Sequence, residues 1–193
     1  MDNIAPDKYN AALARYRSFG LRLRQILASP NDLVITPEIK ALYDFYKNYD
    51  MKTWALLTGA SGAGKTYLTV LLAKRLIRFE QKSVYYFTSE GMRSELNAMT
   101  FEAREMKRQE LMNCDLLIID EIGRSTGTEA YKNHMFEIIN YRYDELKPVI
   151  LISNLSAREL FKGGSMFDEA FQRRVESAGM IFNFEKTFLK EAL

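Results

Sequence analysis

The eight residues from Gly59 to Thr66 have the types and the spacing that phosphate binding requires. They follow the pattern G-x-x-x-x-G-K-T and read Gly59, Ala60, Ser61, Gly62, Ala63, Gly64, Lys65 and Thr66. In such a loop the glycines let the backbone turn its N–H groups toward an anion at the positive end of the following helix. We expect Lys65 to reach the β- and γ-phosphates and the Thr66 hydroxyl to bind Mg²⁺. The expected ligands are therefore ATP and Mg²⁺.

Two acidic residues end an apolar run farther along the chain. The run Leu116–Ile119 leads directly into Asp120 and Glu121. We expect Asp120 to hold Mg²⁺, directly or through water, and Glu121 to orient and polarise the attacking water. An acid at the second position favours an ATPase over a small-molecule kinase, which needs an acceptor pocket there.

Two further candidates lie toward the C-terminus. Asn154 follows another apolar run and is expected beside the γ-phosphate, where it would bind that phosphate or the attacking water. Arg173 and Arg174 are adjacent in a predicted helix, so they point about 100° apart and cannot share one role. One of them is a candidate arginine finger that acts on a neighbouring subunit's nucleotide. The alternative is a pair of solvated surface arginines.

These residues need a sheet that brings strand ends together. Short apolar runs alternate with longer amphipathic stretches, which predicts an α/β fold of three layers with a mainly parallel five-stranded sheet. Ligands of such sheets bind at the C-terminal ends of the strands. The predicted strands are Trp54–Thr58, Ser83–Thr88, Leu116–Asp120, Val149–Ser153 and Met180–Phe184. The predicted helices cover about 65–80, 90–112, 128–146 and 156–178.

The first 50 residues have a different pattern. A basic, amphipathic helix is predicted over 7–28, and a second one from Pro37 to about Tyr49, with Thr36 as its N-cap. We therefore divide the chain into a short N-terminal helical extension (1–50) and an ATPase domain (51–193). The basic helix is either a docking element for a partner or a helix that packs on the core with its arginines outward.

Composition excludes several classes of protein. The chain has 193 residues, a net charge of +2, one cysteine and one histidine. A single cysteine excludes an internal disulfide framework, and a single histidine, His134, excludes a histidine-based metal cluster. No apolar run approaches the ~20 residues of a membrane helix, and the N-terminus is polar. We expect a cytoplasmic protein with no membrane contact.

Residues 52–184 resemble the AAA+ ATPases of the DnaC/IstB type, which include bacterial and phage replicative helicase loaders. Typical of the DnaC-like proteins is the tetrapeptide DEIG at 120–123. Residues 137–155 are similar to the family pattern INxRY…P…SNL, and 181–184 to its IFNW. Arg173 aligns with the arginine of the family's DR motif, with Gln172 where aspartate is usual.

The resemblance implies a fold of the ASCE P-loop NTPase type without a full C-terminal lid, since nine residues follow Phe184. It implies Mg-dependent ATP hydrolysis, with Arg173 acting across a subunit interface. It also implies three partners: a DnaB-type replicative helicase, single-stranded DNA and further copies of the chain in an oligomer or spiral. The family's second sensor arginine would fall near Phe188, with Lys186 and Lys190 the nearest cations. This departure implies weak hydrolysis by the chain alone.

Two other functions share the same core. One is an IstB-like transposition ATPase that acts with a transposase on double-stranded DNA. The other is a helicase-binding inhibitor that keeps the phosphate loop only for nucleotide-dependent binding. If single-stranded DNA is bound, the helix that follows the second strand offers cations and an aromatic ring: Arg93, Phe101, Arg104, Lys107 and Arg108. The alternative for that helix is a solvated face with one core aromatic.

Overall fold

The computed structural model describes residues 6–123, 129–162 and 167–184, without the side chains of residues 6–9 and 129. It contains one parallel sheet in the order β2-β3-β4-β1-β5. The strands are β1 (Trp54–Gly59), β2 (Val84–Thr88), β3 (Leu116–Asp120), β4 (Val149–Ile152) and β5 (Gly179–Phe184). The predicted five-stranded parallel sheet is confirmed, with strand ends within one residue of those predicted.

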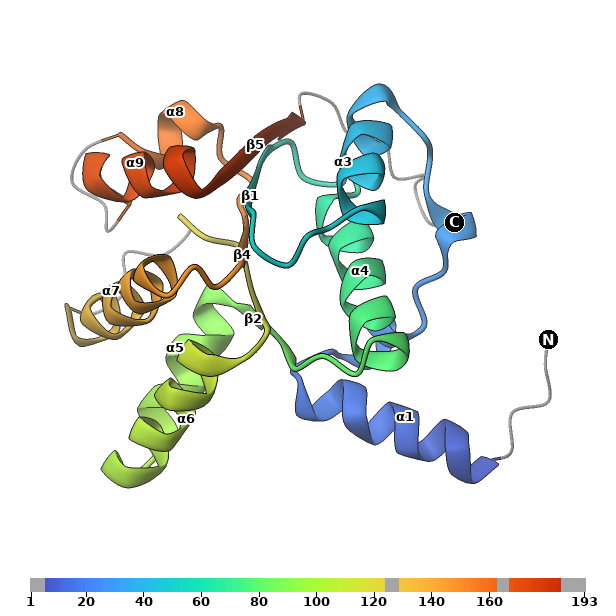
Figure 1. Cartoon of the computed structure of the whole chain (residues 1–193), viewed down its shortest axis with the longest axis horizontal. Coiled ribbons are helices and arrows are strands. Elements are labelled where there is room, and N and C mark those ends of the chain that lie inside the picture. The colour runs from blue at the N-terminus through green and yellow to red at the C-terminus, as the bar shows by residue number, and fades with distance from the viewer. Residues whose placement is uncertain (1–5, 124–128, 163–166, 185–193) are drawn as a thin grey trace.

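Helices cover both faces of the sheet, so the predicted three-layer arrangement is confirmed (Figure 1). One face carries α1 (Pro6–Ser18), α2 (Leu23–Ile26), α3 (Pro37–Lys47) and α4 (Lys65–Phe79). The other carries α5 (Ser89–Ala98), α6 (Phe101–Asn113), α7 (Glu129–Asp144), α8 (Ala157–Leu160) and α9 (Glu169–Ala178). Within the described ranges β5 is the last element, and no helical lid follows it.

The strands are apolar throughout because both of their faces are covered. All five residues of β3 are buried, and its successive side chains enter opposite apolar clusters. Ile118 packs in the cluster that includes α4, whereas Leu117 and Ile119 pack in the cluster that includes α6 and α7. This double cover fixes the C-terminal end of β3, where Asp120 lies.

The prediction of one helix over 7–28 is wrong. Helix α1 ends at Ser18, and Gly20 has φ = +88°, a conformation that favours glycine. At this break the Phe19 carbonyl accepts a 2.9 Å hydrogen bond from the Tyr86 amide, on the edge strand β2. A Cβ atom on Gly20 would lie 2.1 Å from the Tyr86 carbonyl oxygen. The chain therefore turns where it meets the sheet edge.

Two other predicted helices are also interrupted. The stretch 90–112 is α5 followed by α6, because Thr100 caps α6 by accepting a hydrogen bond from the Ala103 amide. The stretch 156–178 is α8 and α9, each capped at its N-terminus by the side chain of Ser156 or Asp168. The second N-terminal helix begins as predicted, with Thr36 accepting from the Ile39 amide.

The N-terminal residues pack in the same apolar cluster as β1 and α4. Buried members from this part of the chain include Tyr16, Leu21, Ile26, Ile39 and Leu42. Both parts contribute to one cluster, so the division into 1–50 and 51–193 remains a proposal about function.

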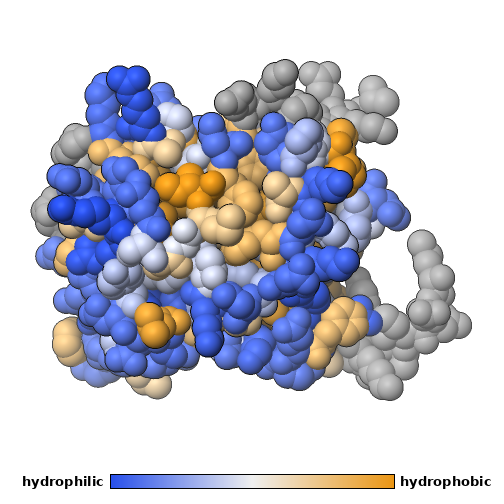
Figure 2. Space-filling view, turned by 45° about the horizontal axis from the view of Figure 1, so that its top comes forward, coloured by the Kyte–Doolittle hydropathy of each residue, from blue (hydrophilic) through white to orange (hydrophobic). Residues whose placement is uncertain are grey.

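None of the helices in the described part of the chain is long and apolar enough to span a membrane. The face shown in Figure 2 has an apolar area at its centre with hydrophilic side chains around it.

Candidate nucleotide-binding site

The phosphate loop begins between the ends of two strands. The Gly59 amide donates to the Leu155 carbonyl (3.0 Å), just beyond β4, and the Ala60 amide donates to the Phe184 carbonyl (2.7 Å), at the end of β5. Gly59 has φ = +104°, and a Cβ atom there would lie 2.1 Å from the Phe184 oxygen. Glycine is therefore required at this close approach, and the loop begins on a rigid base.

Lys65 is buried, with 3% of its surface exposed. Its Nζ donates to the loop's own carbonyls at Gly59 (2.8 Å) and Ala60 (2.7 Å) and to Asn154 Oδ1 (3.3 Å). Burial lowers the pKa of Lys65 to about 8, although the nearby Asp120 carboxylate opposes this shift. The structure thus brings Lys65 and Asn154 together, as expected of a site where both meet a terminal phosphate.

Asp120 is the centre of a hydrogen-bond network at the end of β3. Its Oδ2 accepts from the Thr66 hydroxyl and from the Tyr86 hydroxyl, each at 2.7 Å, and its Oδ1 accepts from the Glu121 amide at 2.7 Å. Burial and the Asp120 charge raise the pKa of Tyr86, so its hydroxyl stays a donor. Tyr86 was not identified from the sequence as a site residue. The available signal was its place on β2, the strand that pairs with β3.

Glu121 adopts a strained backbone conformation. Its φ is +57°, in the left-handed region that non-glycine residues seldom occupy. The conformation is held because the next amide, Ile122 N, donates to the Ile152 carbonyl, and Ser153 Oγ donates to the Ile122 carbonyl. The chain turns sharply after Asp120, and Glu121 lies on the wall of the cavity described next.

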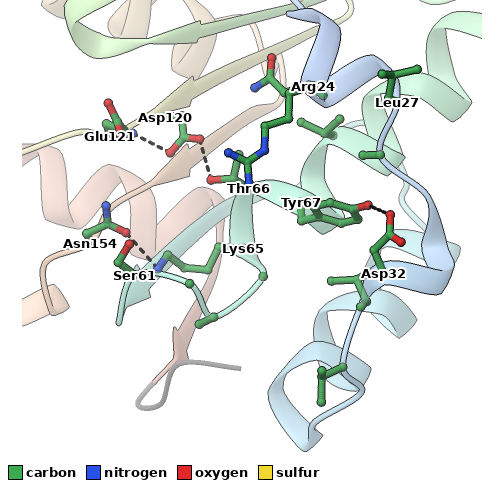
Figure 3. A pocket seen from close by; sticks show the side chains of 18 of the residues that line it. Arg24, Leu27, Asp32, Ser61, Lys65, Thr66, Tyr67, Asp120, Glu121 and Asn154 are labelled. Carbon is green, nitrogen blue, oxygen red and sulfur yellow. Dashed lines mark hydrogen bonds between the residues drawn. The ribbon is translucent and has the colours of Figure 1, made fainter. Parts of the chain in front are cut away.

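Most of the residues predicted from the two motifs line one cavity of about 1040 Å³, although Gly59 and Ala60 do not (Figure 3). One wall consists of Ser61–Thr66, Asp120, Glu121 and Asn154. The opposite wall is the segment 23–34, which the sequence did not predict at this site. This segment is fixed to α4: Lys74 Nζ donates to the Ile26 and Ala28 carbonyls (2.6 and 2.7 Å), and Tyr67 binds Ser29 and Asp32.

The residues present fit Mg²⁺, because the Thr66 hydroxyl and the Asp120 carboxylate place oxygen ligands side by side at the phosphate loop. In the described ranges no three His, Cys, Asp or Glu side chains gather into another metal site.

Arg173 does not line this cavity. It is exposed on α9, with Nη1 3.7 Å from Glu169 Oε1. The guanidinium of Arg174 instead lies over the rings of Phe136 (5.5 Å) and Tyr143 (5.9 Å). The two arginines therefore have different surroundings, and a role of Arg173 toward another subunit remains a proposal. The second-sensor candidates Lys186, Phe188 and Lys190 lie outside the described residues.

Most of the cations named for DNA contact already have partners within the chain. Arg104 donates to the Leu96 and Met99 carbonyls, and Arg108 pairs with Glu105 and Glu137. Lys107 Nζ lies 4.4 Å from the centre of the Tyr85 ring, and Arg93 pairs with Glu90. Phe101 is 75% exposed. The expectation that these residues, which lie on α5 and α6, bind DNA remains untested.

The arginine of the INxRY pattern, Arg142, is fully buried. Its guanidinium donates to the carbonyls of Leu111 (2.8 Å), Met112 (3.1 Å) and Cys114 (3.0 Å), at the end of α6, and of Pro148 (2.7 Å), just before β4. The four carbonyls come from the C-terminal end of α6 and from the residue before β4, so Arg142 joins α6 to β4. Its role is structural.

A family model described as "IstB-like ATP binding protein" matches residues 41–175, well over half of the chain. The chain belongs to this family. XkdC, a protein of the phage-like element PBSX of Bacillus subtilis (strain 168), is 32% identical over 146 residues, or 72% of this chain and 52% of XkdC. The chromosomal replication initiator protein DnaA of Lactiplantibacillus plantarum is 33% identical over 104 residues, or 53% of this chain and 23% of DnaA. The IstB-like chain thus spans about half, or less, of the length of these relatives.

Solved structures show the same fold. The DnaC helicase loader has a TM-score of 0.72 at 18% identity, over 85% of this chain and 100% of that one. DnaI has a TM-score of 0.69 at 20% identity, over 91% and 100%. AMPPCP-bound DnaA from Aquifex aeolicus has a TM-score of 0.68 at 20% identity, over 82% and 51%. The IstB-like chain therefore has the fold of the AAA+ ATPases of the DnaC/IstB type, as the sequence predicted.

Proposed function

We propose that this IstB-like chain binds and hydrolyses Mg·ATP in the cavity above the phosphate loop. One observation carries the proposal: side chains from three separate places in the chain line the same cavity. They are Lys65 and Thr66 at the start of α4, Asp120 and Glu121 at the end of β3, and Asn154 just after β4. Each has a functional group that a phosphoryl-transfer site uses. Such sites catalyse mainly by positioning the reacting groups and by stabilising the charge of the transition state.

Each residue then has one task. The amides of the loop from Ser61 to Thr66 and the Lys65 ammonium bind the phosphates, and Thr66 and Asp120 hold the cation. When bound, Mg²⁺ would offset the charge on the β- and γ-oxygens. Glu121 accepts the proton of the attacking water, and Asn154 orients that water or the γ-phosphate. Arg173 of an adjacent copy would supply a cation from outside, so hydrolysis would depend on self-association.

We propose further that the chain uses ATP binding to assemble on a DnaB-type replicative helicase and to place it on single-stranded DNA. Support comes from the DnaC-like motifs at 120–123, 137–155 and 181–184. It also comes from the structural match, which extends over 100% of the solved DnaC and DnaI chains. In this function ATP is a switch for assembly more than a fuel for movement along DNA.

The proposal is tested with Lys65→Ala, Glu121→Gln and the unmodified chain, each mixed with the cognate replicative helicase. We expect Lys65→Ala to lose ATP binding and helicase association, and Glu121→Gln to keep both but to hydrolyse at least about 100-fold more slowly. Loss of ATP binding in Lys65→Ala with helicase association intact would contradict the switch.

A loading assay on single-stranded circles separates the two helicase-binding functions. A loader speeds helicase loading on single strands, whereas an inhibitor slows it. ATP-dependent assembly on double-stranded DNA without helicase binding would instead favour the transposition ATPase.

A further inference from the structure

A cation lies on the wall of the cavity that faces the phosphate loop. This wall, segment 23–34, is lined mainly by apolar and amide side chains, and Arg24 of α2 is its one cation among the described lining residues. Figure 3 shows the Arg24 side chain pointing into the cavity, with its guanidinium toward Thr66. Together with Lys65, Arg24 makes up the basic lining of the cavity.

Within the described part of the chain, neither a hydrogen bond nor an ion pair joins the Arg24 guanidinium to another side chain. Other arginines differ, since Arg108 pairs with two glutamates and Arg142 binds four carbonyls. Asp120, one of the acids that line the same cavity, already accepts hydrogen bonds from Thr66, Tyr86 and the Glu121 amide. The five donors of Arg24 are therefore available to an incoming anion.

The backbone that carries Arg24 is held in place. Ile26 and Ala28 are buried, and their carbonyls accept the two Lys74 hydrogen bonds from α4. Gln25 Oε1 accepts from the Arg22 amide and closes the start of α2. Binding an anion would thus order only the Arg24 side chain, which keeps the entropic cost low.

We propose that Arg24 binds the β- and γ-phosphates of the nucleotide from the wall opposite the phosphate loop. This inference rests on the proposed function, since it takes the cavity to be the ATP site. The guanidinium offers two parallel N–H groups that match two phosphate oxygens, while Lys65 acts as a point charge from the wall that carries the phosphate loop. The N-terminal extension thereby becomes part of the nucleotide site, and α2 senses whether a nucleotide is bound.

The test measures the affinity of the full chain for ADP and for the β,γ-methylene analogue of ATP, with Mg²⁺, by titration calorimetry. The variants are Arg24→Gln, Arg24→Lys and the matched control Arg22→Gln, whose exposed arginine does not line the cavity. We expect Arg24→Gln to weaken binding of both nucleotides by about tenfold or more. Arg24→Lys should recover part of the loss, and Arg22→Gln should bind like the unmodified chain.

Two further measurements distinguish a direct contact between Arg24 and the nucleotide from an effect on the fold. The nucleotide-free melting temperature should be the same in all variants, and the loss in Arg24→Gln should shrink as salt rises, because exposed charges are screened. Unchanged affinity in Arg24→Gln, or an equal loss in Arg22→Gln, would overturn the role of Arg24 while Lys65→Ala still loses binding. An unmodified chain that binds neither nucleotide would overturn the proposed function itself.

Discussion

The lowered pKa of Lys65 should make ATP binding depend on pH. In the nucleotide-free protein this pKa is about 8, against 10.5 for an ordinary lysine. A bound triphosphate stabilises the ammonium and returns the pKa toward or above its usual value. The free protein must therefore take up a proton on binding whenever Lys65 is neutral. About nine-tenths of the Lys65 side chains are charged at pH 7, half at pH 8 and a tenth at pH 9.

The affinity for ATP should consequently fall by about tenfold from pH 7 to pH 9, the window in which free Lys65 loses its proton. At pH 8, calorimetry in buffers of different ionisation enthalpy should show uptake of about half a proton per ATP. Lys65→Arg is the control, because a guanidinium stays charged over this range. The affinity of Lys65→Arg for ATP should be lower overall but should not change between pH 7 and pH 9. An affinity of the unmodified chain that does not change with pH, or an equal loss of affinity in Lys65→Arg, would contradict the role of Lys65 protonation.

Three further outcomes follow from the structure. Tyr86→Phe removes one donor from Asp120 and should lower the free energy of unfolding by about 1.5–3 kcal/mol, measured by urea denaturation; no loss would show that Asp120 does not need this donor. Arg142→Met removes a charged donor from four buried carbonyls and should cost about 3–5 kcal/mol in the same assay, whereas Arg173→Met, on the surface, should cost under 0.5 kcal/mol. Gly20→Ala should destabilise by more than about 1 kcal/mol, seen as a lower melting temperature, and an unchanged temperature would contradict the close approach to Tyr86.

The parts of the site that local sequence determines were predictable. Two local patterns indicate both the site residues and their place at the sheet edge. One is a glycine-rich loop before a helix, and the other is an apolar strand that ends in two acids. The parallel order then brings Asp120 to Thr66 and Asn154 to Lys65, because the loop and both strand ends meet at the same edge.

Features that depend on long-range packing were not predictable. Arg24 and Tyr86 are 62 residues apart in sequence, yet both contribute to the site, one from the opposite wall and one from β2. The break at Gly20 was missed for the same reason: the apolar periodicity of 7–28 continues through it. The residue that ends the helix is set by the approach of Tyr86, which no local pattern contains.

If the proposed function is right, ATP binding at this site switches association with a replicative helicase. The most direct measurement is light scattering of the chain mixed with its cognate replicative helicase, with and without a non-hydrolysable ATP analogue. We predict a complex of fixed stoichiometry that depends on the nucleotide and disappears in Lys65→Ala. No complex in either state would contradict the claim and favour the transposition ATPase.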